Sequence, residues 1–129
     1  MKYISAEQFQ EQPKKVQKVL LKWWKPSIGD LCWYKKSEFV SMVDIDCNDE
    51  ATKNLILFFK IPLFTEGQLR EFIQYTTEYR IEISNKDYYK VSISKDGPDF
   101  RECHVETSTD IVQAYWKVAC KIADNGGEI

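Results

Sequence analysis

The residues best able to carry acid–base or nucleophilic chemistry are few in this chain and are not grouped. His104 is the one histidine, and cysteines stand singly at positions 32, 47, 103 and 120 without a CxxC pair. Histidine is the usual proton carrier near neutral pH and the commonest metal ligand. Cys103 and His104 are neighbours in an expected strand, where adjacent side chains point to opposite faces, so they are badly placed to exchange a proton. We therefore expect no enzyme, no metal site and no cofactor.

One acidic run begins like a calcium-binding loop, because Asp44, Asp46 and Asn48 follow the D-x-D-x-N spacing. The sixth position is Asp49, where the motif requires glycine, and the twelfth is Leu55, where it requires a bidentate glutamate. These departures disfavour calcium. The run is then a solvated loop or a patch for a basic partner surface. The acidic patch would comprise Asp44, Asp46, Asp49 and Glu50.

A lysine-rich helix face offers a second type of site. The expected helix after Pro13 places its apolar residues on one side and its lysines on the other. Such a face could follow nucleic-acid phosphates, although it is also the ordinary solvent side of an amphipathic helix, and the net charge of −2 does not favour a polyanionic partner. Nucleic-acid or nucleotide binding is therefore the alternative function, and it would use Lys14, Lys18, Lys22 and Lys25.

Tyrosine and tryptophan indicate the leading type of site, which is a surface for another protein. Aromatic residues make up 14% of the chain, and these two types are enriched at interfaces because they add a large area at little entropic cost. The simpler interpretation places them in the core and on half-exposed strands. The candidate partner-binding residues are Trp33, Tyr34, Tyr75, Tyr79, Tyr88, Tyr89 and Trp116.

Length and composition favour one globular domain covering residues 1–129. The first residues lack the apolar region of a signal peptide, and the longest apolar run, Leu55–Phe59, is far shorter than a membrane span. We expect a cytoplasmic protein with reduced cysteines and no membrane association.

The expected elements follow from capping signals, apolar periodicity and turn residues. Ser5 and Thr65 each begin a capping box and so predict helices, a further helix lies between Pro13 and Pro26, and Thr107 or Ser108 caps a last helix over about 109–124. That last helix is apolar around most of its circumference, so it is either packed on two sides or partly used by a partner. The expected strands are Leu31–Tyr34, Phe39–Ile45, Leu55–Lys60, Tyr79–Ser84, Tyr88–Ser94 and Phe100–Val105.

Short turns between these strands favour antiparallel pairing. Helices that lie between hairpins favour an α+β fold over a parallel α/β sheet. We expect a single antiparallel sheet of about five or six strands, with the helices packed against it as one pair of layers.

Four segments resemble small uncharacterised proteins carried by phages and prophages of Gram-positive bacteria. The resemblance lies in Ile4–Phe9, Trp23–Leu31, Pro62–Ile73 and Gln113–Ala123, whereas residues 38–60 and 85–106 are specific to this chain. It implies an accessory protein of a mobile element, and inhibitors of bacterial defence such as anti-CRISPR proteins are one such class. It assigns no functional residue.

The leading hypothesis is therefore a non-catalytic accessory protein that binds a host or phage protein, with a homodimer as one form of self-association. Nucleic-acid binding through the lysine face is the alternative. The third hypothesis is a metal-dependent enzyme, which requires that the fold bring scattered carboxylates together.

Overall fold

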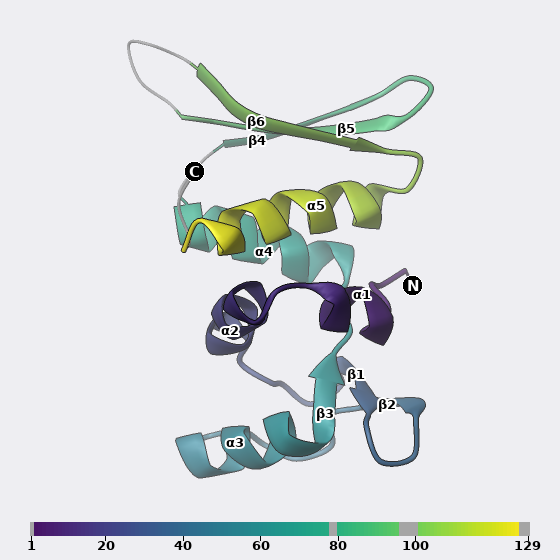
Figure 1. Cartoon of the computed structure of the whole chain (residues 1–129), viewed down its shortest axis with the longest axis vertical. Helices are drawn as coiled ribbons and strands as arrows, with labels where there is room; N and C mark the ends of the chain where they lie inside the picture. The colour runs from purple at the N-terminus through teal and green to yellow at the C-terminus, as the bar shows by residue number, and fades with distance from the viewer. Residues whose placement is uncertain (1, 78–79, 96–100, 127–129) are drawn as a thin grey trace. The chain divides into compact units, whose positions relative to one another are not determined.

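The computed structural model describes residues 2–77, 80–95 and 101–126. The fold is mixed α+β, as expected, but its strands form two three-stranded antiparallel sheets, so the prediction of one sheet is wrong. The chain divides into two compact units (Figure 1). The N-terminal unit is Ile4–Phe64, and the C-terminal unit is Met1–Tyr3 with Thr65–Ile129. Each sheet belongs to one unit, because the three strands that pair in it lie close together in the sequence.

The N-terminal unit begins with two helices, α1 (Ala6–Glu11) and α2 (Lys14–Trp23). The predicted capping box at Ser5 is confirmed: the Ser5 hydroxyl accepts from the Gln8 amide at 3.1 Å, and the Gln8 side chain accepts from the Ser5 amide at 3.0 Å. The chain leaves α2 at Trp24, whose indole Nε1 donates to Asp30 Oδ2 at 3.1 Å. This bond fixes the loop that leads into the sheet.

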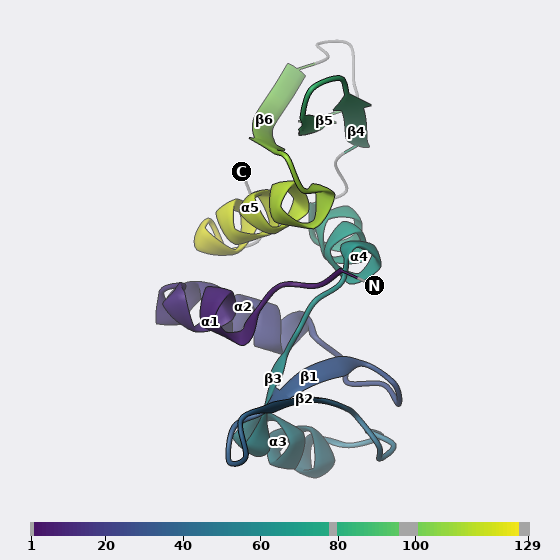
Figure 2. The same cartoon turned by 90° about the vertical axis from the view of Figure 1, so that its right-hand side faces the viewer.

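The sheet of this unit has the order β2-β1-β3 and contains the predicted hairpin. Strand β1 (Leu31–Tyr34) pairs with β2 (Phe39–Met42), which ends before Ile45, and also with β3 (Lys60–Pro62). Within this unit, α3 lies on the other side of the sheet from α1 and α2 (Figure 2).

Helix α3 (Glu50–Phe59) replaces the strand predicted over Leu55–Lys60. Asp49 begins the helix, because its carboxylate accepts from the Thr52 amide at 2.7 Å. A helix started there continues through the apolar run, which is too short for its periodicity to separate helix from strand. The strand prediction is therefore wrong except at Lys60, the first residue of β3.

The two ends of the N-terminal unit are joined to each other, because the Ile4 amide donates to the Phe64 carbonyl at 3.0 Å. Both residues belong to its core. Phe64 also packs against the rings of Phe9, Trp23 and Trp24, with centroids 6.1–6.5 Å apart. In the C-terminal unit, an antiparallel bridge joins Tyr3 to Thr65.

The C-terminal unit consists of α4 (Glu66–Thr77), the meander β4 (Arg80–Asn85), β5 (Tyr89–Lys95) and β6 (Arg101–Ser108), and α5 (Ile111–Asp124). The capping box at Thr65 is confirmed by its bonds with Gln68. The predicted turn between β4 and β5 is also observed, whereas the predicted strand ends at Tyr79 and Phe100 lie outside the described residues. Helix α5 is capped by Asp110 and not by Thr107 or Ser108.

Both helices lie on one side of the β4-β5-β6 sheet (Figures 1 and 2). Helix α5 contacts α4 on one side and β5 and β6 on another. Its buried residues therefore occupy a wide arc, which the two packing surfaces explain. Of the two interpretations of this broadly apolar helix, packing on two sides is the one observed.

Candidate functional site

His104 lies on β6 and its Nε2 is 2.5 Å from Glu106 Oε2. In the strand register these residues stand opposite Ile93 and Val91, so they share the face of the sheet that those buried residues occupy. A pair at positions i and i+2 of a strand is the ordinary neighbour arrangement on one face. The side chain of Cys103 lies outside the described part of the chain. Among the described residues, no three of the His, Cys, Asp and Glu side chains gather as a group that could hold a metal ion.

The acidic run is divided among different roles. Asp49 caps α3, and hydrogen bonds from Thr52 hold the pKa of its carboxyl below the ordinary value. Asp44 lies 3.8 Å from Lys60 Nζ across the sheet. Asp46 and Glu50 are exposed. The run therefore stabilises a helix end and carries solvent-facing charge.

The lysine face is fully formed on α2 and just beyond it. Lys14, Lys18, Lys22 and Lys25 are all exposed, as the helical spacing predicted. The neighbouring tryptophans point elsewhere, because Trp24 is buried and Trp23 packs on Phe64. The described structure thus provides cations on this face without the rings on which bases would stack.

The predicted partner-binding aromatics do not form one surface. Trp33 and Tyr34 belong to the N-terminal unit and the others to the C-terminal unit, where Tyr79 lies outside the described residues. Trp116 is 4% exposed, so its ring belongs to the core and offers no contact area. The remaining candidates differ in exposure: Tyr75 and Tyr88 are exposed, while Trp33, Tyr34 and Tyr89 are half-buried.

Tyr34 is the candidate that the fold brings into a cluster. Its ring lies 5.5 Å from Phe39 and 6.2 Å from Phe59, and Phe59 lies 5.0 Å from Phe58. We call these four residues the aromatic array. Phe39 is 48% exposed and Phe58 is 73% exposed. The array therefore runs from β2 through β1 to the end of α3 and presents open rings at both of its ends.

Lys35 holds the array together. Its amide donates to the Phe59 carbonyl at 2.9 Å, and its Nζ donates to the Leu57 carbonyl at 3.1 Å. Both acceptors lie in the last turn of α3, where carbonyls lack intrahelical partners and a cation is favourable. The end of β1 is thus fixed to the end of α3 by two hydrogen bonds.

An open strand edge lies beside the array. Strand β2 is at the edge of its sheet, and Val40 and Met42 are exposed on it. In an antiparallel pair, the backbone groups of successive residues point alternately toward and away from the neighbouring strand. The Val43 amide donates to the Asp30 carbonyl at 2.9 Å, so the backbone groups of Val40 and Met42 point away from β1. The Met42 carbonyl accepts from Lys60 Nζ at 3.1 Å. No charged residue or proline interrupts this strand, although edge strands commonly carry them.

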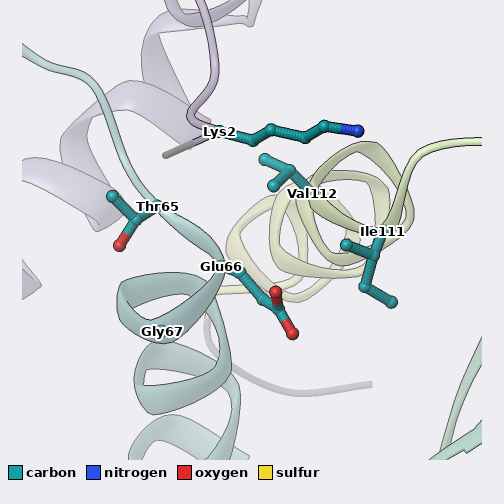
Figure 3. Close-up of a pocket in the computed structure, with 6 residues that line it drawn as sticks. All are labelled: Lys2, Thr65, Glu66, Gly67, Ile111 and Val112. Atoms are coloured by element: carbon teal, nitrogen blue, oxygen red, sulfur yellow. The ribbon is translucent and has the colours of Figure 1, made fainter.

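The C-terminal unit has a surface hollow of about 500 Å³ near the N-terminal ends of α4 and α5. Figure 3 shows Lys2 extended beside Val112, with Glu66 on the α4 side. Lys2 Nζ is 3.4 Å from Asp110, which already caps α5, and Glu66 is 3.5 Å from Arg70. The charged groups at this hollow are thus engaged with one another.

Burial raises the pKa values of two side chains on α5, Tyr115 and Cys120. Burial raises the pKa of the Tyr115 phenol, whose oxygen accepts from Arg70 Nη2 at 3.0 Å and Nε at 3.2 Å. Burial also raises the pKa of the Cys120 thiol to about 12. A thiol with this pKa carries almost no thiolate near neutral pH.

Of the aromatic array, only Tyr34 was predicted from the sequence. Phe39, Phe58 and Phe59 are neither Tyr nor Trp, and the apolar run that contains Phe58 and Phe59 predicts a buried strand. Helical spacing from the Asp49 cap was the available signal, since it places Leu55, Phe58 and Phe59 along one side of a helix.

Comparison of the chain with protein-family models, with curated proteins and with solved structures found no match. Across the described residues, none of the helices combines the length and apolar character needed to cross a membrane.

Proposed function

We propose that this protein is a non-catalytic accessory protein of a phage or prophage that binds a host protein through the aromatic array. The observation that carries the proposal is the exposure of Phe39 and Phe58 at the two ends of a continuous set of ring contacts. Exposed apolar clusters of this kind mark interaction surfaces. Inhibition of a bacterial defence system is one outcome that such binding would have.

Two further features support a protein as the partner. The bonds from Lys35 fix the array in advance, which lowers the entropy lost on binding. The open edge of β2 supplies outward backbone groups at Val40, and an extended segment of a partner pairs with such groups. Rings and a strand edge together suit a polypeptide better than a small molecule.

The test is a comparison of two variants of the full chain. Phe39→Ser with Phe58→Ser removes both open ends of the array, while Tyr75→Ser removes an aromatic ring that is 76% exposed on the C-terminal unit. Proteins from a Gram-positive lysate are recovered on each immobilised variant and quantified by mass spectrometry. We expect a protein retained by the wild type and by Tyr75→Ser to fall at least tenfold on the double variant.

Two outcomes would contradict the proposal. One is equal recovery of every protein by the wild type and the double variant. The other is an equal loss with Tyr75→Ser, because the binding would then not depend on the array. Circular dichroism of each variant checks that the fold is retained.

The exposure of Lys14, Lys18, Lys22 and Lys25 keeps nucleic-acid binding as the second candidate. For this function, we expect DNA or RNA to show a salt-dependent electrophoretic mobility shift with the protein, and we expect the double variant Lys18→Glu with Lys22→Glu to weaken it. The absence of any shift at low salt would remove it.

A further inference from the structure

The N-terminal unit contains a second hollow, of about 270 Å³, which the aromatic array does not use. Its apolar lining comes from Phe9 on α1, Leu21 on α2, Leu57 on α3 and Ile61 on β3. Phe9 and Ile61 are core residues. The hollow therefore opens onto the apolar core, and its volume is close to the lower limit of small-ligand sites.

Three lysines line the same hollow, and each comes from a different segment. They are Lys14 on α2, Lys35 after β1 and Lys60 on β3, and none of the described lining residues is a carboxylate. Lys60 Nζ is directed to the Met42 carbonyl, with Asp44 3.8 Å away. Lys35 Nζ donates to one carbonyl, and an ammonium group has three donors. Positive charge thus exceeds negative charge around this space.

The start of α2 adds to this imbalance. Lys14 is its first residue, and no side chain caps the first turn, because Pro13 occupies the N-cap position. The first turn of a helix carries free amide groups and the positive end of the dipole, so a lysine there is unfavourable and an anion is favourable. Within the described part of the chain, Lys14 has no ion pair that would offset this cost.

We propose that this hollow binds a small organic anion, with one anionic group among the lysines and an aromatic or branched aliphatic body against the apolar lining. Lys14 and Lys35 hold the charge. Phe9, Leu57 and Ile61 exclude water from the apolar body. This site uses none of the four residues of the array and shares with it only the supporting Lys35, which the test variants leave unchanged.

The test uses phenylphosphate as the probe, with isotope-labelled full-length protein observed by NMR. We expect amide shifts at Phe9, Leu57 and Ile61 that saturate in the millimolar range or below and weaken as salt is raised. Phenylacetamide supplies the body without the charge, and inorganic phosphate supplies the charge without the body. Each of these two compounds is expected to bind at least fivefold more weakly than phenylphosphate.

The matched variants are Lys14→Gln and Lys18→Gln, which each remove one positive charge from an exposed position of α2. Of these two lysines, Lys14 lines the hollow and Lys18 does not. We expect Lys14→Gln to weaken phenylphosphate at least fivefold and Lys18→Gln to change it less than twofold. Equal effects of the two variants, equal binding of phenylacetamide, or no shift at 10 mM phenylphosphate would each overturn the proposal.

Discussion

Two strongly apolar helices, α5 and α3, differ in how much of their apolar surface is covered. Helix α5 has eight buried residues, because α4 and the β4-β5-β6 sheet pack on different sides of it. Helix α3 has one buried residue, Ile56, while Leu55 and Phe58 are exposed. Apolar content therefore does not identify a binding surface. The number of elements that pack on a helix decides how much of its apolar surface is left open.

The largest expected difference between the two helices is in the effect of truncating one aromatic residue on each. Trp116→Ala removes a buried ring from α5 and is expected to lower the free energy of unfolding by about 3–5 kcal/mol. Phe58→Ala removes an exposed ring from α3 and is expected to cost less than about 1 kcal/mol, because only the edge contact with Phe59 is lost. Urea denaturation followed by circular dichroism measures both. Equal losses would mean that the two helices do not differ as described.

Hydrogen bonding across the α4–α5 pair is tested by Tyr115→Phe. The variant removes the hydroxyl that accepts twice from Arg70, and we expect a loss of about 1–2 kcal/mol in the free energy of unfolding at pH 7. Tyr75→Phe is the matched control, since its hydroxyl is on an exposed ring of the same unit. A control that lost as much stability would show that the Arg70 contact contributes nothing specific.

The same pair of variants predicts a pH dependence. Because the folded pKa of Tyr115 is raised, its phenol ionises in the unfolded chain from about pH 10 and in the folded protein only at higher pH. The unfolded state then holds fewer protons, so stability falls as pH rises above 10. We expect Tyr115→Phe to lose less stability than Tyr75→Phe between pH 9 and 11 in urea titrations.

The smallest expected effect is at the first turn of α3, where Asp49 is the N-cap. Asp49→Ala removes the cap of α3, whereas Asp46→Ala removes a nearby exposed carboxylate. Hydrogen exchange is expected to quicken in the first turn of α3 for Asp49→Ala alone. Since the folded pKa of Asp49 is lowered, its contribution is present above pH 3.8 and is lost as pH falls through the folded pKa. Equal exchange in the two variants at pH 6 would contradict the capping role.

Local signals predicted much of the fold. Helices begin at Ser5 and Thr65, as their capping boxes predicted. Hairpins lie where segments of alternating apolar and polar residues are joined by turn residues. The division into two sheets could not be predicted, because alternation and turn residues indicate where strands lie and not which of them share a sheet. The short run around Phe58 was assigned to a strand because local periodicity does not distinguish the two structures there.

The candidate site was less predictable than the fold. The aromatic array depends on ring contacts between β1, β2 and α3, and these follow from the tertiary bonds of Lys35. Phe58 is likewise exposed in the described structure, although the residue's own type favours burial. The lysine face was predictable because it depends only on spacing within one helix.

The bond between the Ile4 amide and the Phe64 carbonyl has a consequence for how this chain can be rearranged. A segment whose two ends meet can be excised, grafted or exchanged as a cassette, with only a short splice needed where it was removed. Residues Ile4–Phe64 are such a cassette, and they carry both the aromatic array and the lysine-lined hollow. Recombination at these two adjoining positions would replace this unit while the sequence around α5 stayed as it is.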